Sequence, residues 1–271
     1  MRGAAFLGYH SVSPEGPPFL SVPPSQFEAH LRILRQRGWA NGDRAALEAF
    51  VDGRPLGGRH VFLTFDDGYR DSVTQALPRL VEYGYTASFF VLPSRLDAGG
   101  PLDWQGVEDH QRQYPDVMRS LTWEMVEQLA EANMEIGSHT VSHPRLSQIG
   151  DEELRQELLD SRREIAARLG RCDSLAYPYG DWSPRVAAAA DAAGYRFAFT
   201  LPFETQEGGD RLTIPRITID RRDAAWRFRA KMSAPGRRLF LSSAKPTLRA
   251  LRSAIRRGPD RGTEDDGRQA R

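Results

Sequence analysis

Two short motifs, far apart in the chain, carry residue types that could bind a divalent cation together. Asp66 and Asp67 stand in Thr-Phe-Asp-Asp-Gly, and His139 and His143 are the ends of His-Thr-Val-Ser-His. Histidines four residues apart share one face of a helical turn, where both imidazoles can reach one metal ion. Two adjacent carboxylates in a buried site cannot both be freely ionised without a cation. We therefore expect one aspartate to join the histidines as a ligand and the other to stay free as a base.

Each motif alone also has an explanation that involves no chemistry. Asp-Asp-Gly occurs at ordinary turns from a strand to a helix, and two histidines four apart can be a capping or core pair. The two motifs in one chain are more specific than either. Two imidazoles and one carboxylate leave coordination positions open, which is the pattern of catalytic rather than structural zinc sites.

The chain around both motifs alternates between strand-like and helix-like patterns. Buried strands are predicted at residues 4–9, 60–65, 86–92, 134–137, 174–177, 195–200 and 212–219. Helices are predicted to begin near Ser25, Gly68, Thr122, Asp151 and Ser183. This alternation is typical of a parallel sheet or barrel, in which sites form at the carboxyl ends of the strands. Both motifs come directly after predicted strands, so we expect their side chains to converge.

A third motif, Tyr-Pro-Tyr-Gly at residues 177–180, completes a pattern that resembles the polysaccharide deacetylase family, also called the NodB-homology family. The resemblance covers residues 4 to 220. It is nearest to the branch of exopolysaccharide and poly-N-acetylglucosamine deacetylases. It implies an α/β fold of the distorted (β/α)7 barrel type.

The same resemblance implies a role for each motif residue. Asp66 is expected to be the general base, and the backbone amide of Tyr179 is expected to help bind the oxyanion. The implied cofactor is a divalent metal, with Zn2+ as the expected ion, and its expected ligands are Asp67, His139 and His143.

The chain departs from the common family pattern in two places. Ala176 stands where many members have an arginine, and no histidine comes after His143 to act as a late acid. His10, in Leu-Gly-Tyr-His-Ser, looks like the early Tyr-His element of the exopolysaccharide branch, so we expect it to protonate the leaving amine. Arg216, at the end of a late strand, is expected to hold Asp66 and lower its pKa. The ordinary alternatives are a loop histidine and a surface arginine.

Three further residues are expected to contact the substrate. They are Tyr69, after the first motif, Pro178 in the third, and Trp182 just beyond it. Trp104 and Trp123 could also stack on a sugar ring, although a tryptophan is more often part of a core.

These expectations define an enzyme that removes the N-acetyl group from a saccharide, glycan or lipid-linked precursor. One alternative is a deformylase or deacetylase of a small nucleotide- or lipid-linked sugar, for which the same site would serve. Another is a carbohydrate-binding protein that has lost catalysis, and the complete set of four motif carboxylates and imidazoles weighs against it.

Composition excludes several classes of protein. The 271 residues include 37 Lys and Arg and 36 Asp and Glu, a net charge of +1, so no nucleic acid partner is expected. Cys172 is the single cysteine, so no intrachain disulfide is possible. No signal-peptide pattern and no run of ~20 apolar residues is present, and a cytoplasmic location is expected.

The sequence suggests three parts. Residues 1–225 form the expected deacetylase barrel domain, 226–257 a basic amphipathic segment, and 258–271 a tail expected to be disordered because it is charged and nearly free of apolar residues. No acidic residue occurs from Ala224 to Pro259. Such a segment could lie on the inner face of an anionic membrane and bring the enzyme to a lipid-linked sugar or a membrane glycosyltransferase. The alternative is a helix packed on the barrel.

Overall fold

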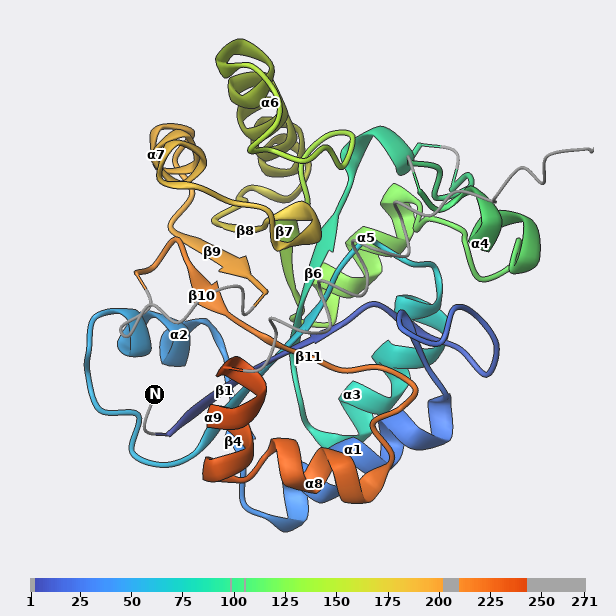
Figure 1. The fold of residues 1–271 in the computed structure, drawn as a ribbon, viewed down its shortest axis with the longest axis vertical. Coiled ribbons are helices and arrows are strands. Elements are labelled where there is room, and N and C mark those ends of the chain that lie inside the picture. The colour runs from blue at the N-terminus through green and yellow to red at the C-terminus, as the bar shows by residue number, and fades with distance from the viewer. Residues whose placement is uncertain (1–2, 98, 105, 202–209, 243–271) are drawn as a thin grey trace, which may run out of the picture.

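The computed structural model describes residues 3–97, 99–104, 106–201 and 210–242. The expected disordered tail at 258–271, and residues 243–257 of the basic segment, lie outside the described residues. The described chain forms a parallel sheet that curves into a nearly closed barrel, with helices around its outside (Figure 1). The expected barrel class is therefore confirmed.

The barrel strands lie within a few residues of the predicted bounds. They are β1 (Ala4–Tyr9), β5 (His60–Phe65), β6 (Ala87–Val91), β7 (Glu135–Ser138), β8 (Ser174–Ala176), β9 (Phe197–Thr200), β10 (Ile214–Pro215) and β11 (Ile217–Thr218). Their order is β10-β9-β8-β7-β6-β5-β1-β11. The last predicted strand, at 212–219, is thus two strands at opposite ends of the sheet. Only Arg216 separates them, so the chain crosses the barrel seam at this residue.

Three short strands lie outside this order. β2 (Ser11–Val12) and β3 (Ser21–Val22) pair with each other just after β1, and β4 (Ala40–Asn41) pairs with β5.

Helices surround the strands. They are α1 (Pro24–Gln36), α2 (Arg44–Val51), α3 (Leu77–Tyr83), α4 (Glu108–Gln113), α5 (Trp123–Glu131), α6 (Asp151–Leu169), α7 (Pro184–Ala192), α8 (Ala225–Lys231) and α9 (Ala234–Ser242). Those predicted near Ser25, Thr122, Asp151 and Ser183 begin within two residues of these positions, but the N-caps of α1 and α6 are Pro23 and Gly150 rather than Ser25 and Asp151. The Thr122 and Ser183 side chains accept hydrogen bonds from the amides of Met125 and Val186, so they cap α5 and α7. A π-helical turn, η1 (Ser72–Ala76), precedes α3.

The strands alternate between an inner and an outer apolar face. On the inner face, Phe6, Phe62, Phe90 and Phe199 form one buried cluster, against which α2 packs. The rings of Phe6 and Phe62 are stacked with centroids 4.5 Å apart. The outer face packs against the surrounding helices in a larger cluster. This filled interior gives the strand ends a rigid base.

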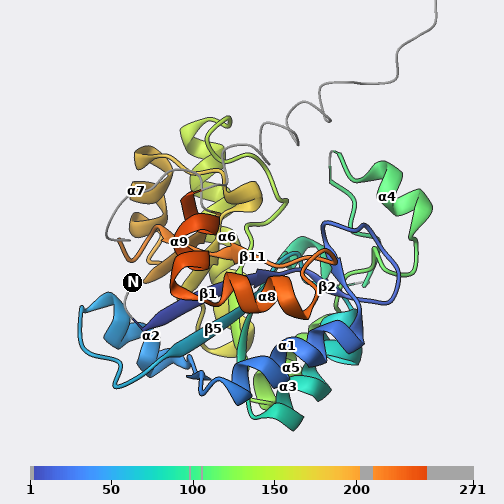
Figure 2. The same cartoon turned by 60° about the horizontal axis from the view of Figure 1, so that its bottom comes forward.

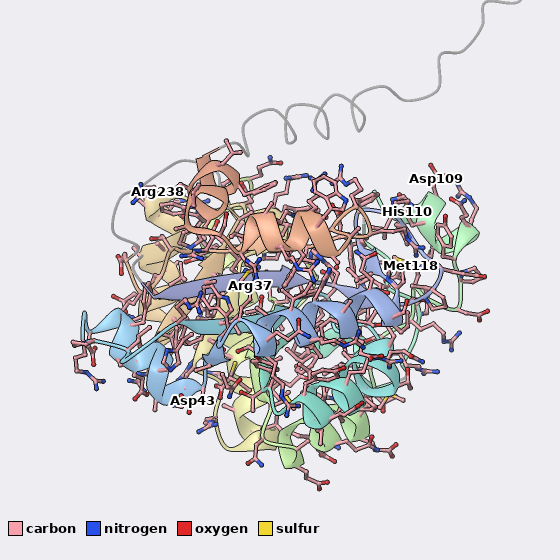
Figure 3. All side chains as sticks on the ribbon, turned by 90° about the horizontal axis from the view of Figure 1, so that it is seen from below. Arg37, Asp43, Asp109, His110, Met118 and Arg238 are labelled. Carbon is pink, nitrogen blue, oxygen red and sulfur yellow. The ribbon has the colours of Figure 1, made fainter. Side chains whose placement is uncertain are left out.

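The described part of the basic segment packs on the barrel. Phe228 of α8 and Met232 are buried in the larger cluster, and α8 lies beside α1 (Figure 2). Arg238 of α9 lies at the opposite side of the molecule from Asp109 and His110 of α4 (Figure 3). Among the described residues, no helix is both long and apolar enough to span a bilayer.

Candidate metal centre

Three predicted ligands converge at the carboxyl ends of the strands. Asp67 lies just beyond β5 and His139 just beyond β7. One Asp67 oxygen, Oδ1, lies 3.2 Å from Nε2 of His139 and 3.3 Å from Nε2 of His143. All three side chains are buried, and their candidate ligand atoms lie within 4.8 Å of one another. The structure therefore brings together the trio that the sequence predicted.

The hydrogen bonding of His139 shows that this cluster fits a cation. Its Nδ1 lies 2.8 Å from the carbonyl oxygen of Ala176, which can only accept, so Nδ1 carries a proton. In a neutral imidazole, Nε2 then presents a lone pair toward the Asp67 carboxylate. Two acceptors that face each other at 3.2 Å are held together by a positive charge between them, which either a metal ion or the second proton of an imidazolium supplies. A ligating histidine that donates its other N–H to a carbonyl is common at metal sites.

The close packing of the three ligands shifts their pKa values. Burial raises the pKa of Asp67, but hydrogen bonds from His139 and His143 outweigh it, and the net shift is downward. Burial lowers the pKa of His139, yet the hydrogen bond to Asp67 and the charges of both aspartates shift it upward. For His143, burial prevails and lowers the pKa. Asp67 is thus an ionised carboxylate in a buried site, as a metal ligand must be.

The expectation that the two histidines share a helical turn is wrong. The segment after β7 is a non-helical loop in which Thr140 and His143 adopt the left-handed region, with φ of 70° and 68°. A helix would aim both imidazoles from one axis, whereas the loop turns His143 back toward His139. The three predicted residues converge although the predicted local conformation is wrong.

Glu157 of α6 holds this loop, and it was not predicted from the sequence. Its carboxylate accepts hydrogen bonds from the amides of Val141 and Ser142, at 2.8 and 3.0 Å, and from the Ser142 hydroxyl at 2.5 Å. Glu157 is 8% exposed. Its position on the buried face of the helix, beside Leu154 and Leu158, is the signal that could have identified it.

Asp66 is held by Arg216. The guanidinium donates to both carboxylate oxygens, Nη1 to Oδ1 and Nη2 to Oδ2, each at 2.7 Å. Burial raises the pKa of Asp66, but the charge of Arg216, the charge of His139 and the Arg216 hydrogen bonds together outweigh it, so the net shift is downward. Arg216 has no exposed surface and also donates to the Thr64 hydroxyl at 2.8 Å. The expected link between the two residues is therefore present, and the alternative of a surface arginine is excluded.

His10 comes directly after β1 and is half-buried at the same end of the barrel. A charge on His10 lowers the pKa of both Asp66 and Asp67. Its contribution is smaller than that of Arg216 at Asp66 and smaller than that of the His139 and His143 hydrogen bonds at Asp67. Its Nδ1 is buried and has no hydrogen-bond partner among the described residues. His10 thus lies at the same end of the barrel as the two aspartates, and its role as the acid stays a prediction.

The third motif forms a wall of the site. Pro178 and Tyr179 lie in the short 3-10 turn η3 (Pro178–Gly180), directly after β8, and Tyr179 adopts a left-handed φ of 59°. The Tyr179 ring lies 4.5 Å from that of His143, measured between centroids. Burial raises the pKa of Tyr179 to about 12, so the phenol is neutral. Pro178 is buried beside it.

Two expected substrate contacts lie elsewhere. Tyr69 has no exposed surface, and its hydroxyl lies 3.6 Å from the sulfur of Met118 inside a small apolar cluster. Trp182 is half-buried against the main core cluster. Of the tryptophans considered from the sequence, Trp104 is the one in contact with the ligand set, with its ring 4.3 Å from that of His143.

The family profile described as polysaccharide deacetylase matches residues 53–198, more than half of the chain. The chain belongs to the polysaccharide deacetylase family. It is 28% identical to YxkH of Bacillus subtilis (strain 168) over 197 residues, 72% of this chain and 63% of that protein. It is also 32% identical to the poly-β-1,6-N-acetyl-D-glucosamine N-deacetylase of Escherichia coli (strain K12) over 146 residues, 51% of this chain. That match covers 21% of the Escherichia coli protein, so the chain spans less than two thirds of either relative.

Solved structures share the fold. The Streptococcus pyogenes deacetylase PplD, in complex with acetate, superposes with a TM-score of 0.69 at 22% identity, covering 85% of this chain and 98% of that one. IcaB from Ammonifex degensii superposes with the same TM-score of 0.69 at 23% identity, covering 84% and 97%.

Proposed function

We propose that this chain is a metal-dependent hydrolase that removes the N-acetyl group from an N-acetylated sugar and releases acetate and a free amine. The observation that carries the proposal is the buried cluster of Asp67, His139 and His143 beside the arginine-held Asp66. Membership of the deacetylase family supports it. So do relatives named as deacetylases of poly-N-acetylglucosamine and of chitooligosaccharides.

In this proposal Asp67, His139 and His143 would hold zinc, which when bound would supply Lewis-acid polarisation of the acetyl carbonyl and a lowered pKa for a water molecule. Asp66 takes the proton from the attacking water, and Arg216 keeps its carboxylate ionised and oriented. The amide of Tyr179 donates to the oxyanion; one such donor is worth about 3 kcal/mol. His10 gives a proton to the departing amine, which is too basic to leave as an anion. Pro178 is proposed to border the bound sugar, and Tyr69 to support the site through the apolar cluster that it shares with Trp104 and Tyr179.

Acetate release tests the proposal. Purified protein is incubated with chitooligosaccharides and poly-N-acetylglucosamine oligomers, with and without a chelator, and acetate is quantified. We expect chelator-sensitive release that zinc restores, loss of release in Asp67→Ala, and retained zinc but lost release in Asp66→Asn. Full activity of Asp66→Asn would show that the assigned base is wrong. A wild-type chain that binds zinc but releases no acetate from any N-acetylated saccharide would leave the carbohydrate-binding alternative.

A second candidate substrate is a small sugar that carries phosphate, as a nucleotide- or lipid-linked sugar does. Arg145 favours it. The guanidinium carbon of Arg145 lies 4.1 Å from the centroid of the Tyr179 ring, whose other neighbour is the imidazole of His143. The Arg145 side chain forms no ion pair with a described residue. A phosphate on the substrate would find a cation there. Arg145→Gln should raise KM for a phosphate-bearing sugar but not for a neutral oligosaccharide, whereas Arg155→Gln on α6 should change neither. Equal kinetics of the Arg145 variant on both substrates would remove this candidate.

We further propose a cytoplasmic location at the inner face of the membrane. Support comes from the segment without acidic residues from Ala224 to Pro259, of which Arg229 and Arg238 are exposed in α8 and α9. Co-sedimentation with phosphatidylserine vesicles is expected to exceed that with phosphatidylcholine vesicles, and to fall in Arg229→Glu/Arg238→Glu and in a chain that ends at Ser242. Binding that ignores lipid charge would contradict the proposal.

A further inference from the structure

The two histidines of the candidate metal centre are held in different ways. Nδ1 of His139 lies 2.8 Å from the Ala176 carbonyl oxygen, which fixes the rotation of that ring. Nδ1 of His143 is buried and has no hydrogen-bond partner among the described residues. A ligating histidine usually donates this N–H to a carboxylate, carbonyl or water, and that bond sets the ring orientation. At His143, the contacts that the described residues provide are ring contacts.

Aromatic rings surround His143 instead. The centroid of its imidazole lies 4.3 Å from the Trp104 ring, at an interplanar angle of 31°. Tyr179 lies 4.5 Å away at 64°, and His139 lies 4.9 Å away at 61°. Separations of this size are those of directly packed rings. Trp104 is the neighbour closest to parallel, so it covers a face of the imidazole while the other two meet it at steep angles.

Trp104 is itself held firmly, although it lies in the long connection between β6 and α5. The amide of Leu102 donates to the carbonyl of Met118 at 3.0 Å, and the amide of Val107 donates to the carbonyl of Trp104 at 3.3 Å. The Trp104 side chain is 9% exposed and belongs to the apolar cluster that contains Tyr69 and Met118. The indole face is therefore a fixed wall rather than a mobile cover.

We infer that Trp104 is a positioning residue for His143. Its indole face sets the rotation of the imidazole, so that Nε2 points to the Asp67 oxygen 3.3 Å away. Trp104 thus fixes the ring orientation of His143 by stacking, whereas the Ala176 carbonyl fixes that of His139 by a hydrogen bond. The inference rests on the proposed metal site and adds a residue to which the motifs of the family resemblance assign no role.

Zinc affinity tests the inference without recourse to activity. The dissociation constant is measured by competition with a chromophoric chelator for the full-length chain and for Trp104→Leu, Trp104→Phe and Trp226→Leu. Loss of an outer contact of a metal ligand typically weakens affinity by about 10–100-fold, and we expect a weakening of this order in Trp104→Leu. Trp104→Phe retains an aromatic face and should stay close to wild type. Trp226 is 71% exposed on α8, so its leucine variant is the matched control and should be unchanged.

The melting temperature of the metal-free protein separates positioning from packing. If Trp104→Leu lowers the metal-free melting temperature but binds zinc as tightly as wild type, Trp104 only fills space and the inference is overturned. Trp104→Met, whose longer and more flexible side chain has no ring, replaces the leucine variant if that one does not fold, and the same weakening is expected. If the wild-type chain itself binds no zinc, the proposed function fails first, which is a distinct result.

Discussion

Arg216 and Asp66 form a buried two-pronged ion pair at the seam of the barrel. Both guanidinium Nη atoms donate to the carboxylate at 2.7 Å. The guanidinium carbon, Cζ, lies 5.6 Å from the ring centroid of Phe90 and 5.8 Å from that of Phe199, both on the inner face of the barrel. Arg216 is the residue between β10 and β11, where the chain crosses the barrel seam. The same crossing therefore places the Arg216 guanidinium beside the proposed base, Asp66.

We predict that Arg216→Met destabilises the fold strongly. The substitution leaves the Asp66 carboxylate buried without its cation, and breaking such a pair typically costs about 3–5 kcal/mol. Arg216→Lys keeps the charge but cannot donate in the same planar fork. It should therefore fold and bind zinc, while acetate release falls by at least about tenfold, because the base is no longer oriented. Chemical denaturation and acetate assays measure the two effects. Wild-type turnover in Arg216→Lys would show that the fork geometry is unimportant.

Zinc should stabilise the folded chain. At a free zinc concentration 100 times the dissociation constant, a ligand that binds only the native state adds about 2.7 kcal/mol. For a domain of this size that corresponds to a rise in melting temperature of roughly 5–10 °C. The measurement is a thermal melt of the chelator-treated protein with and without added zinc. His139→Gln should melt at the same temperature in both conditions, and a zinc-dependent rise in that variant would indicate that the stabilising ion binds elsewhere.

Glu157→Gln should weaken zinc binding although the residue is not a ligand. Its carboxylate accepts three hydrogen bonds from Val141 and Ser142, and a neutral amide can accept with only one of its two terminal atoms. The loop that carries His143 should then loosen, because the amides of Val141 and Ser142 lose a charged acceptor, and hydrogen bonds to charged groups are worth about 1.5–3 kcal/mol. Glu153→Gln, on the exposed face of α6, is the control. Unchanged zinc affinity in Glu157→Gln would mean that the loop keeps its shape without this carboxylate.

His30 should make the fold sensitive to acid. It is buried between Tyr9 and Asp223 and stacks on Phe228, and burial lowers its pKa to about 4 from 6.5; a hydrogen bond to the Asp223 carbonyl opposes this shift and Lys231 adds to it. As pH falls from 6.5 toward 4, His30 binds a proton in the unfolded chain but not in the folded chain, so the free energy of unfolding decreases across this window. The loss is about 3 kcal/mol over the window.

His30→Gln removes that proton linkage. The variant is expected to be less stable than wild type at neutral pH, but its stability should fall less steeply between pH 6.5 and 4. His110→Gln on α4 should keep the wild-type slope. The test is the free energy of unfolding in urea at several pH values. Parallel curves for wild type and His30→Gln would contradict the account.

The barrel and the convergence of the motif residues could be predicted because their signals are local. Strands such as β1 and β5 are short buried runs bounded by turn residues, and the carboxyl ends of parallel strands meet at one end of a barrel. Asp67 and His139 are the first or second residues beyond such runs, so their convergence is a consequence of the alternation of elements.

The parts that were missed depend on contacts between distant segments. The division of residues 212–219 into two strands is set by which neighbours close the barrel, and nothing in the run itself marks Arg216 as the break. The left-handed backbone at Thr140 and His143 is stabilised by Glu157 from the next helix, against the local preference of non-glycine residues. Trp104 and Trp182 are indistinguishable as sequence, and only packing separates the one beside His143 from the one on the core.

X-ray absorption or anomalous diffraction at the zinc edge of a zinc-loaded protein is the most direct test of the central claim. We predict one ion bonded to a carboxylate oxygen of Asp67 and to Nε2 of both His139 and His143. A fully loaded protein whose ion lies at any other set of side chains, or a chain that takes up no ion at this cluster, would contradict it.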